Sequence, residues 1–309
     1  LFIVLNASSG RDDAADVRST VERELTQAGR EHQVVQLARG DDIEHAMQTA
    51  AAQALAANGA LVVAGGDGTV NAAAQAAHAA GCAMGVLPQG TFNYFSRTHG
   101  IPSDTEAAAR LLLIASPQPV QVGLVNGRVF LVNASLGLYP QALEDREGYK
   151  RQFGRRRWVA MLSALATLTR EHRQLVLSIE LDGETRTVRT PTLFVGNNRL
   201  QLEQVGIPQA PALDAGHVAA IMLRPAGTLA LLWLMLRGAF GTLGDAERVI
   251  SFEFQRMTVR PSLPFGRRGV KVAADGELMR LRSPIEFGVS PRPLWLLKPE
   301  ASAGRLAAK

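Results

Sequence analysis

Cysteine, aromatic residues and long apolar runs are all scarce in this chain of 309 residues. The single cysteine, Cys82, excludes an internal disulfide and fits a reducing compartment, and we expect it to be a buried packing residue. The longest apolar run, Leu229–Leu236, falls far short of the ~20 residues that a membrane-spanning helix needs. The sequence therefore predicts a cytoplasmic protein without a membrane span.

Histidine is sparse too, and its six copies follow no metal-binding spacing. No Ser-His-Asp order and no Cys-His pairing stands out, so we expect each histidine to be structural or exposed. At the start of the chain, Leu1–Leu5 runs directly into Asn6 without a basic leader or a cleavage-site pattern. We interpret this segment as the first strand.

Charge is nearly balanced, with 33 Lys and Arg against 28 Asp and Glu, a net charge of +5 and a pI near 9.9. This mild excess favours anionic partners such as nucleotides, nucleic acid or acidic membranes. Because no nucleic-acid-binding module is recognisable, we expect no nucleic-acid partner. Hydrophobic residues make up 47% and charged residues 20%, which is typical of a globular protein with a sizeable core.

The first third of the chain alternates strand and helix patterns. Short apolar runs indicate buried strands, and Gly29 and Asn58-Gly59 end the helices between them. This order implies a mostly parallel sheet with helices on its faces. The predicted strands are Leu1–Leu5, Gln33–Leu37, Ala60–Ala64 and Met84–Leu87, and the predicted helices run from Asp12 or Asp13 to Ala28, over Ile43–Ala57 and over Thr69–Ala80.

The rest of the chain is dominated by strand patterns. Asn126-Gly127 and Asp182-Gly183 are strong signals for two-residue hairpin turns. We predict a mainly antiparallel β-sandwich with two helical insertions, over Arg155–Arg170 and Thr228–Phe240. The predicted strands are Val120–Val125, Arg128–Val132, Leu175–Leu181, Thr185–Arg189, Thr192–Gly196, Val218–Leu223, Ile250–Val259, Val270–Ala273 and Leu278–Leu281.

The predicted fold class is α/β plus β. A doubly wound α/β domain of the nucleotide-binding type covers residues 1–118, and a β-sandwich domain covers residues 119–290. A C-terminal extension over residues 291–309 is expected to pack back on the first domain.

Three glycines and an acid follow the third predicted strand, in Gly65-Gly66-Asp67-Gly68-Thr69. Glycines let a backbone approach phosphate closely, and a following helix offers unpaired N–H groups and its positive dipole end. Asp67 beside phosphate is suited to hold Mg²⁺, directly or through water. We expect phosphate binding here, with tight packing of strand and helix as the alternative.

Two further loops are expected at the same edge of the sheet, where ligands of open α/β sheets bind. They are Asn6-Ala7-Ser8-Ser9-Gly10 and Pro88-Gln89-Gly90-Thr91-Phe92-Asn93. Taken singly, Asn6 and Ser9 are equally well explained as ordinary loop or cap residues.

Together these loops resemble the diacylglycerol kinase catalytic domain family, which includes bacterial lipid kinases and sphingosine kinases. The first loop is similar to the family's N-P-x-S-G, with Ala7 in place of proline. The second is the family's G-G-D-G-T unchanged, with Asn71 at the position that follows it, and the third matches P-x-G-T-x-N. Val195-Gly196-Asn197-Asn198 and Asp275-Gly276-Glu277 are similar to further family landmarks.

The resemblance implies an ATP-dependent lipid kinase with Mg²⁺, in which ATP and a diacylglycerol-like lipid meet in a cleft between the two domains. The resemblance assigns catalytic roles to Asp67 and to Glu277, with Glu277 as the general base for the acceptor hydroxyl. Read from the residues alone, Glu277 could simply be a solvated residue after a hairpin turn. The implied ATP-binding residues are Asn6, Ser9, Gly65, Gly66, Asp67, Gly68, Thr69, Val70, Asn71, Ala72, Gly90, Thr91 and Asn93.

The chain departs from the family pattern at several positions. Tyr94 stands where the family usually has Asp, and Gln36 stands where some bacterial members have an ATP-contacting Thr. The stretch Leu213–Ala219 is similar to the D-D-G-x-L-D stretch of a structural metal site, but it keeps only Asp214 and Gly216. We therefore expect Mg²⁺ at Asp67 and only a doubtful second metal at Asp214.

The segment from Gly148 to Trp158 carries five basic residues among aromatics. Such a cluster can attract anionic lipid headgroups, so we expect transient peripheral contact with the inner face of a membrane; a solvated helix start is the alternative. The apolar helix around Leu229–Leu236 is interpreted as buried, with a lipid-facing helix as the alternative. The five basic residues are Lys150, Arg151, Arg155, Arg156 and Arg157.

Other readings stay open at this point. A dinucleotide kinase acting on NAD shares Gly-Gly-Asp-Gly-Thr, although the third loop and Asp275-Gly276-Glu277 favour a lipid kinase. The departures at Tyr94 and Ala215 leave room for a catalytically silent lipid- or nucleotide-binding protein. A homodimer is also possible.

Overall fold

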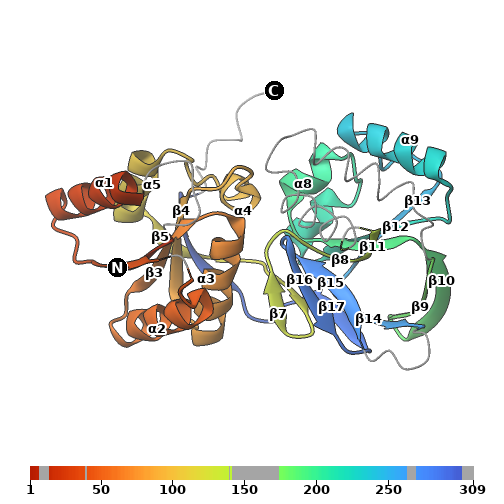
Figure 1. Cartoon of the computed structure of the whole chain (residues 1–309), viewed down its shortest axis with the longest axis horizontal. Coiled ribbons are helices and arrows are strands. Elements are labelled where there is room, and N and C mark those ends of the chain that lie inside the picture. The colour runs from red at the N-terminus through yellow and green to blue at the C-terminus, as the bar shows by residue number, and fades with distance from the viewer. Residues whose placement is uncertain (7–13, 39, 139, 141–173, 263–268, 301–309) are drawn as a thin grey trace. The chain divides into compact units, whose positions relative to one another are not determined.

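The computed structural model describes residues 1–6, 14–38, 40–138, 140, 174–262 and 269–300. The chain divides into two compact units, the first formed by Leu1–Gln121 with Pro291–Lys309 and the second by Val122–Ser290 (Figure 1). The first unit thus ends slightly later than the boundary predicted at residue 118.

The first unit is built on one six-stranded sheet in the order β2-β1-β3-β4-β18-β5. Strands β1 to β4 pair in parallel, so their carboxyl ends share one edge. Strand β18 pairs in parallel with β4 and antiparallel with β5. The strands are β1 Phe2–Asn6, β2 Gln33–Leu37, β3 Ala60–Gly65, β4 Ala83–Pro88, β5 Ser116–Val120 and β18 Leu294–Lys298.

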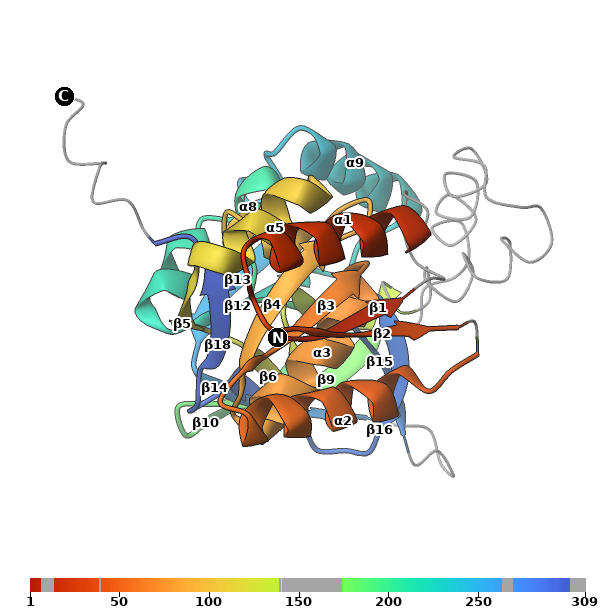
Figure 2. The same cartoon turned by 90° about the vertical axis from the view of Figure 1, so that its left-hand side faces the viewer.

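Helices cover both faces of this sheet, α1 and α5 on one and α2 and α3 on the other (Figure 2). Apolar residues of α1 and α5 share a buried cluster with the sheet. Asp42 and Asp104 cap α2 and α5 by accepting a backbone N–H with their side chains. The helices are α1 Ala14–Gln27, α2 Ile43–Ala56, α3 Asp67–Ala80, α4 Tyr94–Thr98 and α5 Thr105–Ile114.

This architecture confirms the predicted α/β class and its parallel strands. Helix α3 begins at Asp67, two residues before the predicted start, which places the acid in the first helical turn. Helices α4 and α5 and strands β5 and β18 were not predicted, because their segments are short or lack a clear period.

The second unit consists of two six-stranded sheets, in the orders β10-β9-β14-β17-β6-β7 and β13-β12-β11-β8-β15-β16. Every pairing within them is antiparallel over the described residues, as predicted. The strands are β6 Gly123–Val125, β7 Arg128–Phe130, β8 Asn133–Gly137, β9 Leu175–Leu181, β10 Glu184–Thr190, β11 Thr192–Gly196, β12 Val218–Leu223, β13 Val249–Phe254, β14 Arg256–Pro261, β15 Val270–Ala274, β16 Glu277–Leu281 and β17 Ile285–Val289.

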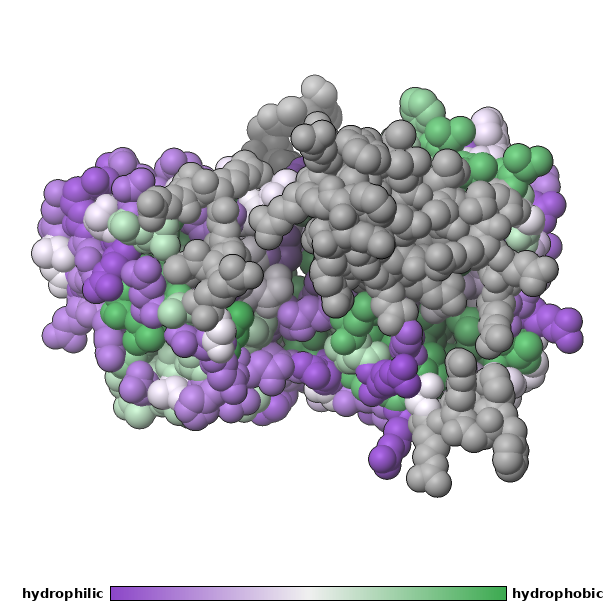
Figure 3. All heavy atoms as spheres, viewed as in Figure 1, coloured by the Kyte–Doolittle hydropathy of each residue, from purple (hydrophilic) through white to green (hydrophobic). Residues whose placement is uncertain are grey.

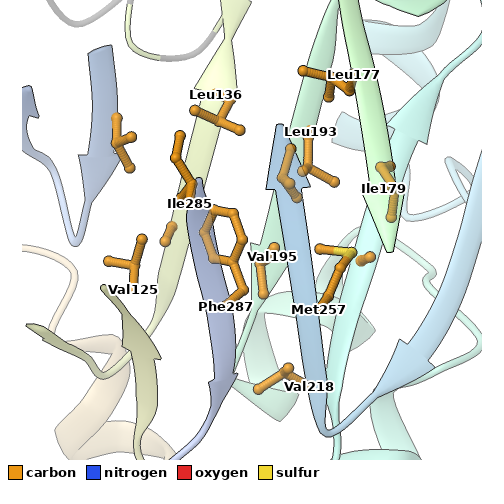
Figure 4. Close-up of a cluster of buried hydrophobic side chains, with 14 of the residues drawn as sticks. Val125, Leu136, Leu177, Ile179, Leu193, Val195, Val218, Met257, Ile285 and Phe287 are labelled. Atoms are coloured by element: carbon orange, nitrogen blue, oxygen red, sulfur yellow. The ribbon is translucent and has the colours of Figure 1, made fainter. Parts of the chain in front are cut away.

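Side chains of both sheets form one apolar core between them (Figure 4). Phe287 and Met257 from the first sheet meet Val195 and Leu136 from the second, and all four are almost fully buried. The predicted sandwich is confirmed. Outside its core lie α8 Arg199–Gln204, the 3-10 helix η1 Ala210–Ala215 and α9 Thr228–Ala239.

Two predicted strands are wrong as single elements. The run Ile250–Val259 is split at Gln255 into β13 and β14, which belong to different sheets. Phe254 and Met257 both enter the core, whereas an unbroken strand would point residues three apart to opposite faces. The run Val120–Val125 is likewise split, since Val120 ends β5 in the first unit and Gly123 begins β6 in the second.

Helix α9 lies where a helix was predicted, but the interpretation as a buried helix is wrong for one of its faces. Leu231 is 2% exposed, whereas Leu229 is 82% exposed. Among the described residues, no helix is long and apolar enough to cross a bilayer. The predicted helix Arg155–Arg170 lies outside the described residues.

Candidate functional site

The glycine-rich loop joins the end of β3 to the start of α3. A side chain at Gly65 would place its Cβ 2.6 Å from Cβ of Thr69, so only glycine lets the strand turn this tightly into the helix. Gly66 is the N-cap residue, and its carbonyl accepts the N–H of Val70 at 3.0 Å. The first turn of α3 therefore presents its backbone N–H groups and positive dipole end at the loop.

The loop after β4 packs directly against this turn. The N–H of Gln89 donates to the carbonyl of Gly65 at 2.9 Å. A Cβ at Gly90 would lie 3.1 Å from Cα of Gly66 and 2.7 Å from Oδ1 of Asn93. Glycine at position 90 thus permits backbone-to-backbone contact between the two loops.

Asp67 and Asn93 tie the two loops together. The N–H of Asn93 donates to Oδ2 of Asp67 at 3.2 Å, and its side-chain amide donates to the carbonyl of Gly90 at 2.9 Å. Asn93 has a φ of 48°, in the left-handed region that Asn tolerates better than most residues. This conformation aims its backbone N–H at the carboxylate.

Burial raises the pKa of Asp67, and hydrogen bonds from the backbone N–H groups of Asn93 and Tyr94 oppose the increase. A half-buried carboxylate with backbone donors is held in one orientation, and its oxygens are of the type that Mg²⁺ prefers. A nearby cation would favour the ionised form and offset the effect of burial.

The end of β1 is linked to the same turn. The side-chain amide of Asn6 donates to Oγ1 of Thr69 at 2.9 Å, and both residues are buried. The structure thus brings Asn6, the Gly65–Ala72 segment and the Gly90–Asn93 loop together, as the sequence predicts. Val70 is itself buried. Ser9 lies outside the described residues.

Tyr94 follows these loops at the start of α4. Its ring stacks on Phe92 with centroids 6.0 Å apart, and Arg97 lies over it at 5.9 Å. An aromatic side chain thus stands where the resemblance predicts a carboxylate. The backbone N–H of Tyr94 still donates a hydrogen bond to the Asp67 carboxylate.

A cavity of about 610 Å³ opens beside Gly90 and Asn93 within the first unit. Sequence reasoning missed its walls, which come from the start of α1 and the start of α5. Gln89 donates to Oγ1 of Thr105 at 3.0 Å at this wall. The only signal in the sequence was the cap pattern around Asp104. The lining residues are Asp16, Val17, Thr20, Pro88, Gln89, Gly90, Asn93, Ser103, Asp104, Thr105 and Glu106.

In the second unit, Asp275 and Gly276 form the turn between β15 and β16. Their φ angles are 47° and 85°, which indicates the type I′ hairpin turn predicted from Asp-Gly. The Asp275 carboxylate accepts three backbone N–H groups, from Leu131 at 2.6 Å, from Val132 at 2.9 Å and from Asn133 at 2.9 Å. The turn is therefore fastened to the segment before β8.

Glu277 is exposed and is the first residue of β16, directly after this fastened turn. The Asn197-Asn198 landmark braces the same segment from another side. The N–H of Asn197 donates to the carbonyl of Val132 at 2.8 Å, and Asn198 caps α8 by accepting the N–H of Gln201 at 3.0 Å. Asn197 and Asp275 thus bind the same segment, the one before β8.

Asp214 lies exposed in η1, and its carboxylate pairs with Arg199. In the part of the chain that the structure describes, no three His, Cys, Asp or Glu side chains gather as a metal site would require. The second metal at Asp214 stays a prediction. The basic residues of the 148–158 segment lie outside the described residues.

Comparison with known proteins places these features in a family. Residues 1–125 match the model of the diacylglycerol kinase catalytic domain. The chain is 30% identical over 267 residues to a Pseudomonas aeruginosa (strain PAO1) protein named "Probable lipid kinase YegS-like", covering 81% of this chain and 80% of that protein. It is 32% identical over 151 residues to the "Diacylglycerol kinase" of Bacillus subtilis (strain 168), covering 46% of this chain and 47% of that protein.

A solved structure shares the fold. The crystal structure of a diacylglycerol kinase from Bacillus anthracis str. Sterne superposes with a TM-score of 0.69 at 18% identity, covering 97% of each chain. The two-unit architecture is thus the one found in that kinase. The family model and the sequence relatives agree with the motifs in the sequence. The chain therefore belongs to the lipid kinase family with a diacylglycerol kinase catalytic domain.

Proposed function

We propose that this protein is an ATP-dependent lipid kinase that transfers the γ-phosphate of ATP to a hydroxyl of diacylglycerol or a related lipid. The observation that supports the proposal is that the end of β1 and the loops after β3 and β4 meet at the carboxyl edge of the first sheet. There the backbone of Gly66 lies against that of Gly90, the carbonyl of Gly65 accepts the N–H of Gln89, and Asp67 lies in the first turn of α3.

The first unit supplies the nucleotide end of the reaction. Phosphate oxygens accept hydrogen bonds from the backbone N–H groups of the α3 N-terminus, where the helix dipole also favours negative charge. The hydrogen bond between Asn6 and Thr69 keeps the end of β1 against this turn. The neighbouring cavity, at about 610 Å³, has the size of a small-molecule site.

The residues present fit a magnesium ion that accompanies ATP. Asp67 offers a carboxylate whose orientation is set by the N–H of Asn93. Asp67 would hold the ion, which would supply positive charge to offset the charge that develops on the phosphoryl oxygens. The lack of a carboxylate at Tyr94 leaves Asp67 as the predicted metal ligand of these loops.

The second unit supplies the general base. As the acceptor oxygen attacks the γ-phosphorus, the bond to the bridging oxygen breaks and ADP leaves, while the Glu277 carboxylate takes the proton of the hydroxyl. Glu277 suits this role because the preceding turn is fixed by three hydrogen bonds to Asp275. The acceptor lipid comes from a membrane, which the basic 148–158 segment contacts.

The proposal is tested by incubating the protein with γ-labelled ATP, Mg²⁺ and mixed micelles of several lipids, with NAD offered in parallel. Label is expected in a lipid, and it is expected to be lost in Glu277→Gln and Asp67→Ala. Glu253→Gln, at an exposed position of β13, is the matched control and should keep full activity. Label in NAD alone would contradict the proposal, as would unchanged activity in Glu277→Gln.

A further inference from the structure

Helix α9 is held to the second unit by one face only. Leu231 and Leu234 are 2% and 5% exposed and pack with Ala246 in a small buried cluster. Partly buried neighbours from β12 and β13 complete the cluster. The helix therefore has its own anchoring core, apart from the core of the sandwich.

The opposite face of α9 is apolar and exposed. Leu229, Trp233, Leu236 and Phe240 follow one another at spacings of four, three and four residues, which places them on one side of the helix. Their exposed fractions are 82%, 61%, 52% and 79%. In Figure 3 hydrophobic atoms gather where Figure 1 places α9. We call these four residues the α9 stripe.

Charge around the stripe is weakly basic. The helix contains no acidic residue, and Arg237 stands in its last turn. At the other end, exposed Arg224 and Arg248 lie side by side, joined by a backbone hydrogen bond of 2.8 Å. Asp245 and Glu247 are the acids of this segment. Arginines at both ends of an apolar stripe complement an anionic surface.

The dimensions of α9 favour a membrane surface over other occupants. With 12 residues, the helix is about 18 Å long, too short for a bilayer core of about 30 Å. Four side chains on one helix offer several hundred Å², below the roughly 800 Å² per partner of a typical stable dimer. Leucine, tryptophan and phenylalanine opposite a packed face, with arginine at the ends, are typical of helices that lie in a membrane interface.

We propose that the α9 stripe docks the protein on an anionic phospholipid surface, with Trp233 and its apolar neighbours inserted at the headgroup level. This inference rests on the proposed function, since a lipid kinase must reach an acceptor that resides in a membrane. The docked helix lies in the plane of the surface and keeps Leu231 and Leu234 on the protein.

The test is sedimentation with vesicles of phosphatidylcholine containing phosphatidylglycerol, at fixed salt. Trp233→Glu is expected to weaken vesicle binding about tenfold, and Leu229→Glu with Leu236→Glu at least as much. Leu55→Glu, at a half-exposed leucine of α2, is the matched control and should bind as wild type. Circular dichroism verifies that each variant is folded. Equal binding of wild type and the α9 variants would overturn the proposal.

Two further outcomes separate docking from catalysis. On a short-chain, water-soluble diacylglycerol, the α9 variants should transfer phosphate as fast as wild type, because no surface is needed. If vesicle binding depended on Trp233 but no lipid were phosphorylated, the docking proposal would be supported and the proposed kinase function would be refuted. A wild-type dimer that Trp233→Glu converts to a monomer, with unchanged vesicle binding, would assign the stripe to self-association and overturn the docking proposal.

Discussion

We expect Asp275→Ala to destabilise the second unit by about 3 to 5 kcal/mol, because it removes the acceptor of three backbone N–H groups. Hydrogen bonds to a charged group contribute about 1.5–3 kcal/mol each. The three bonds share two carboxylate oxygens at a half-buried position. Water can therefore replace part of the loss, and the expected value lies below the simple sum.

Asp182→Ala is the matched control for this substitution. Asp182-Gly183 forms the turn between β9 and β10 with φ angles of 50° and 81°, nearly those of Asp275-Gly276. Both substitutions put alanine, which tolerates the left-handed conformation less well than aspartate, at a turn position with a positive φ. The conformational penalty is therefore the same in both variants and cancels in the comparison. The difference between the two variants measures the hydrogen bonds of Asp275.

The assay is urea unfolding followed by far-UV circular dichroism, with kinase activity measured on the same samples. Asp275→Asn keeps one acceptor oxygen and should fall between wild type and Asp275→Ala. Because Glu277 follows the fastened turn, activity should fall even at low temperature, where each variant is folded. If Asp275→Ala and Asp182→Ala differed by less than about 1 kcal/mol, the stabilising role of these bonds would be refuted.

The remaining predictions concern the first unit. Gly90→Ala should weaken ATP binding by about tenfold or more in calorimetry, because the added Cβ forces the two loops apart. Gly227→Ala is the control: its Cβ would meet no atom within 4 Å, so ATP binding should be unchanged. The pKa of Asp67 is raised, so the affinity for Mg²⁺ with ATP should fall with decreasing pH, starting at a higher pH than for an exposed aspartate. Protonation of ATP itself also weakens Mg²⁺ binding in acid, so the test is the comparison with Asp67→Asn: the pH profiles of wild type and variant should differ, and identical profiles would refute the assignment. Burial raises the pKa of the Cys82 thiol, so iodoacetamide should label it only in denaturant; rapid labelling of the native protein would contradict its packing.

The sequence predicts the meeting of the glycine-rich loop with its neighbours at the sheet edge well, because the cause of the turn is local. Glycines after an apolar strand and a helix beginning at the next acid determine the turn at Gly65 and Asp67 without help from distant residues. Parallel pairing then brings Asn6 and Gly90 to the same edge. The hairpins at Asn126-Gly127 and Asp182-Gly183 were predictable for the same reason.

Features that depend on distant contacts were not predictable. The break at Gln255 depends on which sheet each half of the run joins, and the run itself reads as continuous. The hydrogen bonds of Asp275 to the segment before β8 join residues more than 140 positions apart, so the sequence showed only a turn. The exposure of the α9 stripe likewise depends on the small core beneath it, since the helix is apolar on all sides.

Identification of the reaction products tests the central claim most directly. Wild-type protein, ATP and Mg²⁺ are incubated with a lipid panel, and lipids and nucleotides are quantified by mass spectrometry. The account predicts a lipid phosphorylated on a hydroxyl, formed in equal amount with ADP and absent in Glu277→Gln. ADP formed without a phosphorylated lipid, or a phosphorylated lipid formed equally well by Glu277→Gln, would contradict it.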